Sequence, residues 1–590
     1  MSDQRHKSTV ARRPRSARKH SLADDVRPGQ SPDAETMLFA TPKLESEQAA
    51  EASAVSLLEP VADRADPKAP GAVTTTAPLP AILALPATRD ASPRPTRRRT
   101  WISRVVLVCV LIMQALLTLR MHNTAFEDEA LYLYVGHLEI AHWLHGSALQ
   151  GNYASYFSGA PVLYPPLGAA ADSIGGLAAA RAVSLAEMLG TTALLYSLTR
   201  RLFNERVGLC AAVIFSVTEP TLFLGNLATY DASALLLLAL ATWIVVRTAT
   251  FRWPVYLLAA MPASLAVATK YASLLFVPSI VVIAGLAAWP SRSRQALIRP
   301  IALAGLIAAM LATALDLAGH NYRQGIDFTT LDRFQGTSSA GSLLWDSLQW
   351  AGLPFALALI GAIGFAFRPY TETGEHIAPA GTRLRRTCLG IVMAGSALLA
   401  PAEQIRIHTF VSLQKHIGFG LFLAAPIAGV GLARVIGDHF RRAQVGIAVW
   451  GAAMALGMTQ ANNLFNVWPN SATFVSDFTH YLHPGARYLV EVDEVPIYYL
   501  RHHADAQPDQ FTSTYYIGYV DQQGQFLTGN AGYVAALKAG YFQVVAYNFQ
   551  TTPSVDQVLA RTLATDPDYR LAAAIPNGND TVTQYIWVHT

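Results

Sequence analysis

The chain has 590 residues, of which 52% are hydrophobic and only 14% are charged, whereas about a quarter of a typical soluble chain is charged. This composition excludes an ordinary soluble protein and indicates one that is embedded in a membrane. The formal net charge of +4 gives no reason to expect a nucleic-acid partner, because arginines that border apolar segments account for it.

Residues 1–100 differ in composition from the rest. They contain 12 of the 33 prolines and a single aromatic residue, Phe39. Such a segment cannot bury enough apolar surface to offset its conformational entropy, so we expect a disordered cytoplasmic tail.

Eleven apolar segments are predicted to span the membrane, the first of them from Ile102 to Met121 and about 20 residues long. Residues 101–465 would form this membrane module. The other ten segments are Ile174–Leu198, Val207–Leu224, Ala232–Val246, Val255–Thr269, Ala272–Trp289, Ile301–Ala318, Leu343–Phe367, Thr387–Ala402, Ile417–Ile436 and Val445–Ala461.

The charges between these segments predict the orientation of the chain. Fifteen arginines fall in one set of loops, and six basic residues fall in the loops on the opposite side. Because basic residues favour the cytoplasmic side, we expect a plasma-membrane protein with its N-terminus in the cytoplasm and its C-terminus outside.

Residues 466–590 are predicted to form a small extracytoplasmic α/β domain. Runs rich in Tyr, Val and Ile predict strands, and two segments with helical spacing lie between them. The predicted strands are Arg487–Val492, Phe511–Tyr519, Tyr541–Phe549 and Val582–Val588, and the predicted helices are Val534–Ala539 and Ser554–Ala564.

An acidic triplet, Glu127, Asp128 and Glu129, follows the first predicted span. Charges at a membrane boundary are costly unless they are solvated, paired or functional. No Lys or Arg occurs from position 123 to 173, so no base within this loop accounts for the triplet. The amphipathic stretch at 130–136 would hold a catalytic carboxylate at the bilayer surface. The alternative is an ordinary helix start, where Asp and Glu are favoured.

Other candidate residues lie in the predicted outer loops or near them. Asp231 ends a short outer turn, and one interpretation is that it simply caps the helix that follows. Lys270 lies on the predicted outer side, where the positive-inside rule disfavours a lysine. It either snorkels to lipid phosphates or binds a phosphorylated substrate. Further candidates for substrate contacts are Tyr164 before two prolines, Arg181 in the second predicted span, Arg333, Lys415 and His416.

The order of these features resembles the GT-C class of membrane glycosyltransferases, in particular the family 39 group of protein O-mannosyltransferases and the lipid A aminoarabinose transferase. The resemblance covers about residues 104–461. It implies a GT-C fold and transfer of a sugar from a polyprenyl-phosphate donor to a glycan, lipid or protein of the cell envelope. The family's Asp-Glu pair matches Asp128 and Glu129, and its second carboxylate matches Asp231.

The family's Thr-Lys step matches Thr269 and Lys270, which would face the donor phosphate. The family's first loop often contains Lys-Pro-Pro, whereas Tyr164 precedes Pro165 and Pro166 here. A cation that contacts the phosphate would therefore come from elsewhere in this chain: Lys270, Arg323, Arg333 or Lys415.

The chemistry that this resemblance implies needs few groups. A lipid phosphate is already a good leaving group, so the enzyme needs a carboxylate to accept the acceptor's proton and cations to stabilise the phosphate charge. A divalent metal ion is compatible with this chemistry, but the sequence shows no ligand set for one. Two other classes stay open: a non-catalytic protein that binds lipid-linked sugars, and a multi-pass transporter of lipids or sugars.

Overall fold

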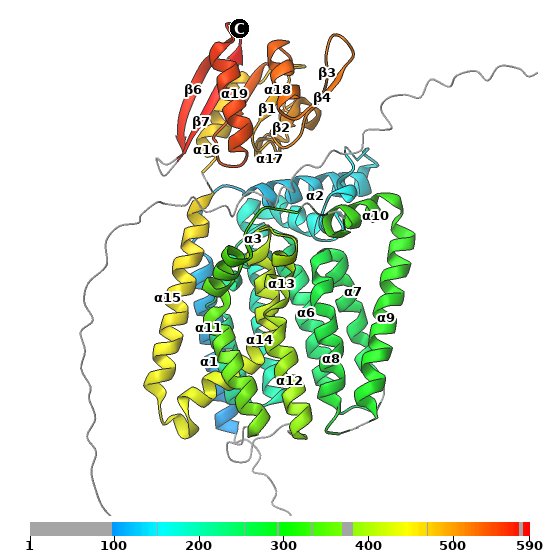
Figure 1. Ribbon diagram of the computed structural model, residues 1–590, viewed down its shortest axis with the longest axis vertical. Helices are drawn as coiled ribbons and strands as arrows, with labels where there is room; N and C mark the ends of the chain where they lie inside the picture. The colour runs from blue at the N-terminus through cyan, green and yellow to red at the C-terminus, as the bar shows by residue number, and fades with distance from the viewer. Residues whose placement is uncertain are drawn as a thin grey trace, which may run out of the picture.

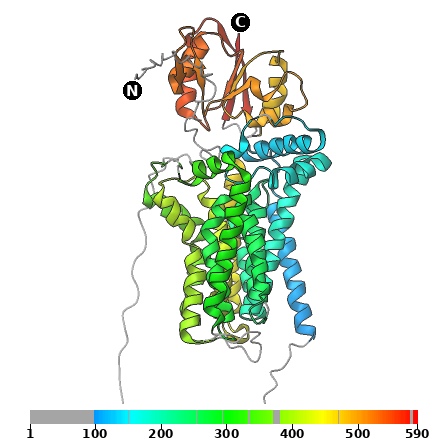
Figure 2. The same ribbon diagram turned by 90° about the vertical axis from the view of Figure 1, so that its right-hand side faces the viewer.

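The computed structural model describes residues 97–149, 151–252, 254–291, 294–331, 333, 335–368, 381–468, 470–577 and 582–590. Residues 1–96 of the predicted tail lie outside this range. The described chain forms a bundle of helices with a smaller α/β domain stacked on one end, as both Figure 1 and Figure 2 show. In chain order, the helices up to the end of the bundle are α1 (Arg97–Thr118), α2 (Glu127–His145), α3 (Tyr164–Leu202), α4 (Glu205–Phe215), α5 (Glu219–Leu224), α6 (Tyr230–Arg247), α7 (Ala260–Thr269), α8 (Val277–Ala288), α9 (Gln295–Ala318), α10 (His320–Ile326), α11 (Ala340–Phe367), α12 (Arg383–Ser396), α13 (Leu399–Arg406), α14 (Leu413–Ile436) and α15 (Ala443–Val467).

Among the described residues, seven helical segments are long and apolar enough to cross a membrane, or eight if α12 and α13, bent by 49°, count as one span. The chain is therefore a multi-pass membrane protein. The predicted count of eleven spans stays a prediction. The seven segments are Trp101–Thr118, Tyr164–Leu202, Tyr230–Arg247, Tyr271–Ala288, Gln295–Ala318, Ala340–Phe367 and Leu413–Ile436.

The predicted span Val207–Leu224 is two short helices instead of one. Helix α4 ends at Phe215, and α5 begins at Glu219 with Pro220 in its first turn. Proline has no backbone N–H and clashes with the preceding turn of a continuous helix, but it fits well at a helix start. The hydropathy of the segment gave no sign of this break.

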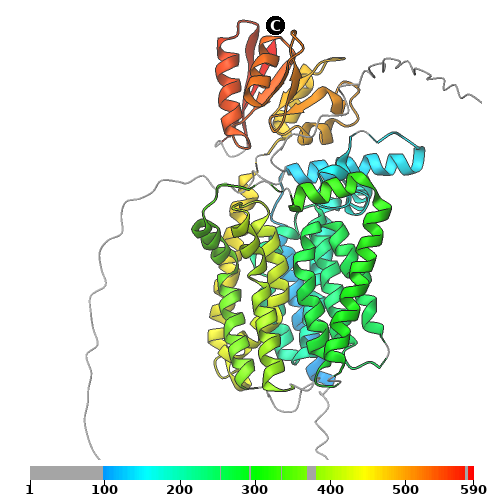
Figure 3. The ribbon, with the colours of Figure 1, turned by 45° about the vertical axis from the view of Figure 1, so that its right-hand side comes forward.

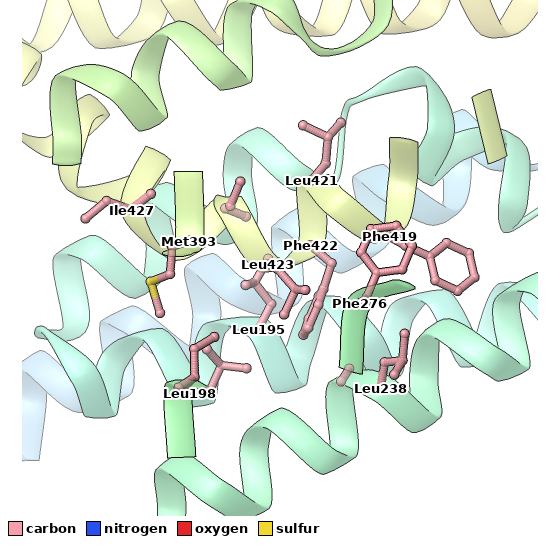
Figure 4. Packing of buried hydrophobic residues seen from close by; sticks show 14 of the residues in the cluster. Leu195, Leu198, Leu238, Phe276, Met393, Phe419, Leu421, Phe422, Leu423 and Ile427 are labelled. Carbon is pink, nitrogen blue, oxygen red and sulfur yellow. The ribbon is translucent and has the colours of Figure 1, made fainter. Parts of the chain in front are cut away.

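Helix α14 lies at the centre of the bundle, and nearly all of its side chains are buried. Figure 4 shows Phe419, Phe422 and Ile427 of α14 among leucines of α3 and α6 and beside Met393 of α12. A helix that is hydrophobic on all sides is stable only when other helices or lipid surround it completely. In α14, other helices provide most of these surroundings.

Helix α2 lies across one end of the bundle, beneath the α/β domain (Figure 1). It packs on the start of α3, where a Cβ at Gly136 would lie 1.9 Å from the Pro165 carbonyl oxygen. Helix α3 has non-helical backbone angles at Gly175 and at Gly176, whose φ is 66°, a conformation that glycine adopts readily. This break separates the turns of α3 that support α2 from its apolar span.

The C-terminal domain is built on a five-stranded mixed sheet with the strand order β2-β1-β5-β7-β6. Strands β2, β1 and β5 are parallel, whereas β7 is antiparallel to both of its neighbours. A two-stranded antiparallel ribbon joins β3 to β4. The elements are α16 (Ala472–Phe478), β1 (Tyr488–Val490), α17 (Glu494–Leu500), β2 (Phe511–Ser513), β3 (Gly518–Val520), β4 (Phe526–Thr528), α18 (Gly529–Lys538), β5 (Val544–Tyr547), α19 (Pro553–Thr565), β6 (Tyr569–Asn577) and β7 (Val582–His589).

The expected α/β domain is thus confirmed, with differences in detail. The predicted strand Phe511–Tyr519 is divided between β2 and β3, which belong to different sheets. Strand β6 and helix α17 were not predicted. Figure 3 shows that this domain lies directly above α2, at the end of the bundle opposite to the start of α1.

Candidate active site at the α2 end of the bundle

The acidic triplet forms the first turn of α2, as its helix-start interpretation predicted, yet all three side chains are buried. Glu127 and Glu129 are 0% exposed and Asp128 is 1% exposed. Their partners come from other helices and from the C-terminal domain. The loop itself holds no Lys or Arg, as the sequence shows, and the basic partners come from α3 and α14.

Glu129 joins four segments of the chain. Arg181 of α3 donates two hydrogen bonds to it, from Nε at 2.8 Å and from Nη2 at 2.6 Å. The backbone N–H groups of Phe126 and Ala228 also donate to Glu129, at 2.9 and 2.8 Å. With these four bonds Glu129 ties α2 to the loop before it, to α3 and to the turn that leads into α6. Arg181, a candidate substrate contact in the sequence, is thus engaged by Glu129.

Asp128 forms an ion pair with Lys415, the third residue of α14. The Lys415 Nζ lies 2.6 Å from Asp128 Oδ2, and both side chains are 1% exposed. The same Nζ lies 5.9 Å from the centre of the Phe126 ring. A buried carboxylate is tolerated only when it is paired or hydrogen-bonded, so this lysine is what permits Asp128 to lie at the end of the bundle.

A second buried ion pair joins Asp231 of α6 to Lys270, the residue after α7. Their Oδ1 and Nζ lie 2.9 Å apart, and both side chains are 0% exposed. Asp231 Oδ2 accepts a hydrogen bond from Thr229 Oγ1 at 3.0 Å. The Lys270 ammonium lies 4.8 Å from the centre of the Tyr230 ring. Lys270 therefore does not snorkel to lipid, and Asp231 does more than cap a helix.

The loop between α2 and α3 packs directly against Thr269 and Lys270. Ala160 N–H donates to the Ala268 carbonyl, and Tyr271 N–H donates to the Ser158 carbonyl, each at 2.8 Å. Between them, a Cβ at Gly159 would lie 1.9 Å from the Thr269 carbonyl oxygen. The approach of these two segments requires glycine at this position.

The other predicted contact residues occupy different surroundings. Tyr164 begins α3 and is 2% exposed, packed among apolar side chains. His416, next to Lys415, is buried, and its Nδ1 lies 3.4 Å from Gln404 Nε2. Arg333 lies between α10 and α11, where it donates to the Val411 carbonyl at 3.5 Å. Of these residues, Lys415 contacts the acidic triplet directly, through Asp128.

The C-terminal domain contributes side chains to the same region. Tyr515 donates to Glu127 Oε1 at 2.7 Å, and the Tyr499 hydroxyl accepts the Ala125 N–H at 2.7 Å. Tyr498 donates to Asp172 of α3 at 2.5 Å, and Arg501 donates to the same carboxylate at 3.1 Å. Sequence reasoning missed these residues, because an isolated tyrosine in an α/β domain gives no sign of the helix that it contacts.

Three carboxyl groups gather where α17 meets α2. Burial raises the pKa of Glu127 well above its ordinary value, and the charges of Asp128 and Asp493 raise it further, against the lowering effects of Tyr515 and Lys415. Burial also raises the pKa of Asp493 to about 6. The pKa of Glu494 is raised well above normal by burial and by the charges of Asp493 and Glu127. This contact between the two parts of the protein therefore favours protonated carboxyl groups.

Within the part of the chain that the structure describes, no group of three or more His, Cys, Asp or Glu side chains is arranged to hold a metal ion. What the geometry supplies is a carboxylate with a lysine directly beside it, repeated in a second Asp–Lys pair. Such an arrangement can accept a proton at one atom and stabilise negative charge at the next.

Solved structures with the same arrangement of helices define the class of fold. ArnT from Cupriavidus metallidurans bound to undecaprenyl phosphate aligns with 82% of this chain and 98% of its own, with a TM-score of 0.53 and 14% sequence identity. The same protein in its apo state gives a TM-score of 0.51 over 83% of this chain and 98% of its own, with 15% identity. The chain thus has the GT-C fold, as the sequence predicted.

The family comparison points in the same direction. The family model described as dolichyl-phosphate-mannose-protein mannosyltransferase matches residues 173–317. No curated protein matches the chain. The resemblance to membrane glycosyltransferases of the protein O-mannosyltransferase and ArnT kind, expected from the sequence, is confirmed.

Proposed function

We propose that the protein is an integral membrane glycosyltransferase that moves a sugar from a polyprenyl-phosphate donor to an acceptor hydroxyl at the α2 end of the bundle. The observation that carries the proposal is the buried pair of Asp128 and Lys415, 2.6 Å apart, in which Asp128 belongs to the pair of residues that matches the family's acidic motif. The matching family model names a dolichyl-phosphate-mannose-protein mannosyltransferase, and the aligned ArnT structure holds undecaprenyl phosphate.

In the proposed reaction the acceptor oxygen forms a bond to the anomeric carbon of the sugar. The bond from that carbon to the phosphate oxygen breaks, and the polyprenyl phosphate leaves with the electron pair. Asp128 accepts the proton of the acceptor hydroxyl. Lys415 lies beside Asp128 and would stabilise the negative charge that develops on the departing phosphate.

The direct contact between Asp128 and Lys415 links proton acceptance by the carboxylate to stabilisation of the phosphate charge by the ammonium. Before the donor binds, the Lys415 ammonium balances the charge of the Asp128 carboxylate. When the donor phosphate draws Lys415 toward itself, Asp128 loses its counter-ion and accepts a proton more readily. The Asp231–Lys270 pair would assist from the facing turn, with Lys270 as a second phosphate contact.

The predicted sidedness places this reaction on the extracytoplasmic face. The acceptor is a cell-envelope glycan, lipid or protein, and the C-terminal domain above α2 is placed to limit which acceptors reach Asp128. The contacts of Tyr515 with α2, of Tyr499 with the loop before α2 and of Tyr498 with α3 support such a role.

A donor panel tests the proposal. Membranes that contain the protein would be incubated with polyprenyl phosphates that carry different radiolabelled sugars, and labelled product would be separated from donor. We expect transfer from one donor or a small subset, and none from membranes without the protein. Specific uptake of a labelled donor to the other side of sealed vesicles without any transfer would contradict the proposal and favour a transporter.

A further inference from the structure

The end of the bundle opposite to α2 contains a cavity that the proposed reaction does not use. It lies between the last turns of α3 and α6 and has a volume of about 130 Å³. Its wall is formed by Ser197, Leu198, Arg200, Arg201, Trp243, Val246 and Arg247. Trp243 Nε1 donates to Ser197 Oγ at 3.0 Å and so joins the two helices across the cavity.

Three guanidinium groups line this cavity, and no carboxylate lines it. Arg200 is paired with Glu205 at 2.8 Å. Arg201 has a weak contact of 3.4 Å to Thr250 Oγ1, and Arg247 lies 5.7 Å from the centre of the Phe251 ring. Among the described residues, no carboxylate is paired with Arg201 or Arg247. The cavity therefore carries an excess of positive charge.

Arginines at helix C-termini have an ordinary explanation, because they suit the helix dipole and the positive-inside rule. That explanation applies to side chains that extend separately into water or lipid headgroups. It does not account for guanidinium groups of two different helices that line one cavity. A cavity of this size holds several atoms besides hydrogen, and its charge favours an anion.

We propose that this cavity binds the phosphate of an anionic phospholipid headgroup, at the membrane surface opposite to the active site. Guanidinium groups bind phosphate oxygens with two parallel hydrogen bonds and are well suited to this ligand. Basic pockets between membrane helices on the cytoplasmic side are a recurrent way of holding such headgroups. The half-buried ring of Trp243 on this wall favours a lipid over a free anion, because it can contact the glycerol or the first carbons of an acyl chain.

Native mass spectrometry of the full-length protein in detergent tests this assignment. Phosphatidylglycerol, phosphatidylcholine and inorganic phosphate would be added in separate titrations. We expect the protein to retain phosphatidylglycerol more tightly than phosphatidylcholine. The double variant Arg201→Gln/Arg247→Gln should weaken phosphatidylglycerol binding about 10- to 30-fold, given the contribution of each basic residue near a charged membrane surface.

The matched control is Arg441→Gln/Arg442→Gln, which removes two exposed arginines at the same end of the bundle but outside the cavity. It should change binding less than threefold. Because Arg247 is exposed and contacts the Phe251 ring, Arg247→Gln alone should fold normally and lose part of the affinity. Ser197→Phe, which fills the cavity without a change of charge, should also weaken binding.

The outcomes of these titrations support or contradict a phospholipid site between α3 and α6. If inorganic phosphate displaces phosphatidylglycerol and binds with similar affinity, the ligand of the cavity is a soluble phosphate and the assignment to a lipid headgroup is wrong. If the cavity and control variants lose equal affinity, the attraction comes from the general positive charge of this surface, and the proposal is wrong. Unchanged binding by Arg201→Gln/Arg247→Gln and by Ser197→Phe would overturn it as well.

Discussion

The buried acidic residues of α2 differ in what surrounds them, and this difference separates structural from chemical roles. Glu129 accepts hydrogen bonds from Arg181 and from two backbone N–H groups, so its oxygens are engaged by the fold. Asp128 has Lys415 beside it, at the end of a helix and below the C-terminal domain. The first arrangement holds a loop in place, and the second can release a lysine to a ligand.

The role of Glu129 predicts a loss of stability. Glu129→Gln removes the charge that balances the buried Arg181 and should lower the free energy of unfolding by about 3–5 kcal/mol, the usual cost of a broken buried ion pair. The control is Glu403→Gln at the exposed pair of Glu403 and Arg406, which should cost less than about 1 kcal/mol. Thermal unfolding in detergent measures both. Equal losses in the two variants would show that Glu129 is not a structural anchor.

The Asp231–Lys270 pair requires a test that separates stability from chemistry. Lys270→Ala leaves Asp231 buried without its partner and should destabilise strongly. Lys270→Arg keeps the charge but not the geometry, so it should retain more donor use than Lys270→Ala. The double variant Asp231→Asn/Lys270→Met removes both charges and should recover stability.

Initial rates of sugar transfer, measured with the donor that the panel identifies, show whether the Asp231–Lys270 pair contacts the donor or only stabilises the fold. A folded double variant with about 100-fold slower transfer would support a contact between Lys270 and the donor phosphate. A folded double variant with normal transfer would show that the pair only holds the bundle together.

At the scale of secondary-structure elements, the contact between α2 and the C-terminal domain should depend on pH. Burial and the charges of neighbouring carboxylates raise the pKa values of Glu127 and Glu494, and burial raises the pKa of Asp493 to about 6. A carboxyl group with a raised pKa stabilises the docked state fully below its ordinary pKa and loses that contribution as the pH rises through the raised value. Docking should therefore weaken from about pH 4 through pH 6 and continue to weaken at higher pH.

Hydrogen exchange of α17 at several pH values, corrected for the intrinsic pH dependence of exchange, measures this docking. Protection should fall as the pH rises, and Glu127→Gln, which keeps an uncharged side chain at all pH values, should flatten the fall. A protection that increases with pH would contradict this assignment of the three carboxyl groups.

Hydrophobic periodicity and charge were sufficient to predict most helices of the bundle and four strands of the sheet, because burial inside a membrane or a sheet constrains whole segments. The break before Pro220 and strand β6 were not predicted, since neither changes the average composition of its segment. The partners of the acidic triplet were missed for another reason. Arg181 lies 52 positions from Glu129, and Lys415 lies 287 positions from Asp128, so only the folded chain shows that they meet.

At the scale of the whole molecule, the predicted orientation places the two ends of the bundle on opposite sides of the membrane. Helix α3 ends at the opposite side from the C-terminus of α15 (Figure 1). Reporter fusions at Arg206 and Asn466 should therefore report the cytoplasm and the exterior, respectively. If both fusions report the same side, the predicted topology is wrong, and with it the side on which the reaction is proposed to occur.

The most direct test of the proposed base is transfer by Asp128→Asn, with a defined donor and acceptor. This variant keeps the shape of the side chain and removes its basicity, so transfer should fall by about 10²–10⁴-fold while donor binding survives. Glu127→Gln, which changes the neighbouring carboxyl group in the same way, should have a mild effect on transfer. Near-normal transfer by a folded Asp128→Asn protein would contradict the assignment of Asp128 as the base.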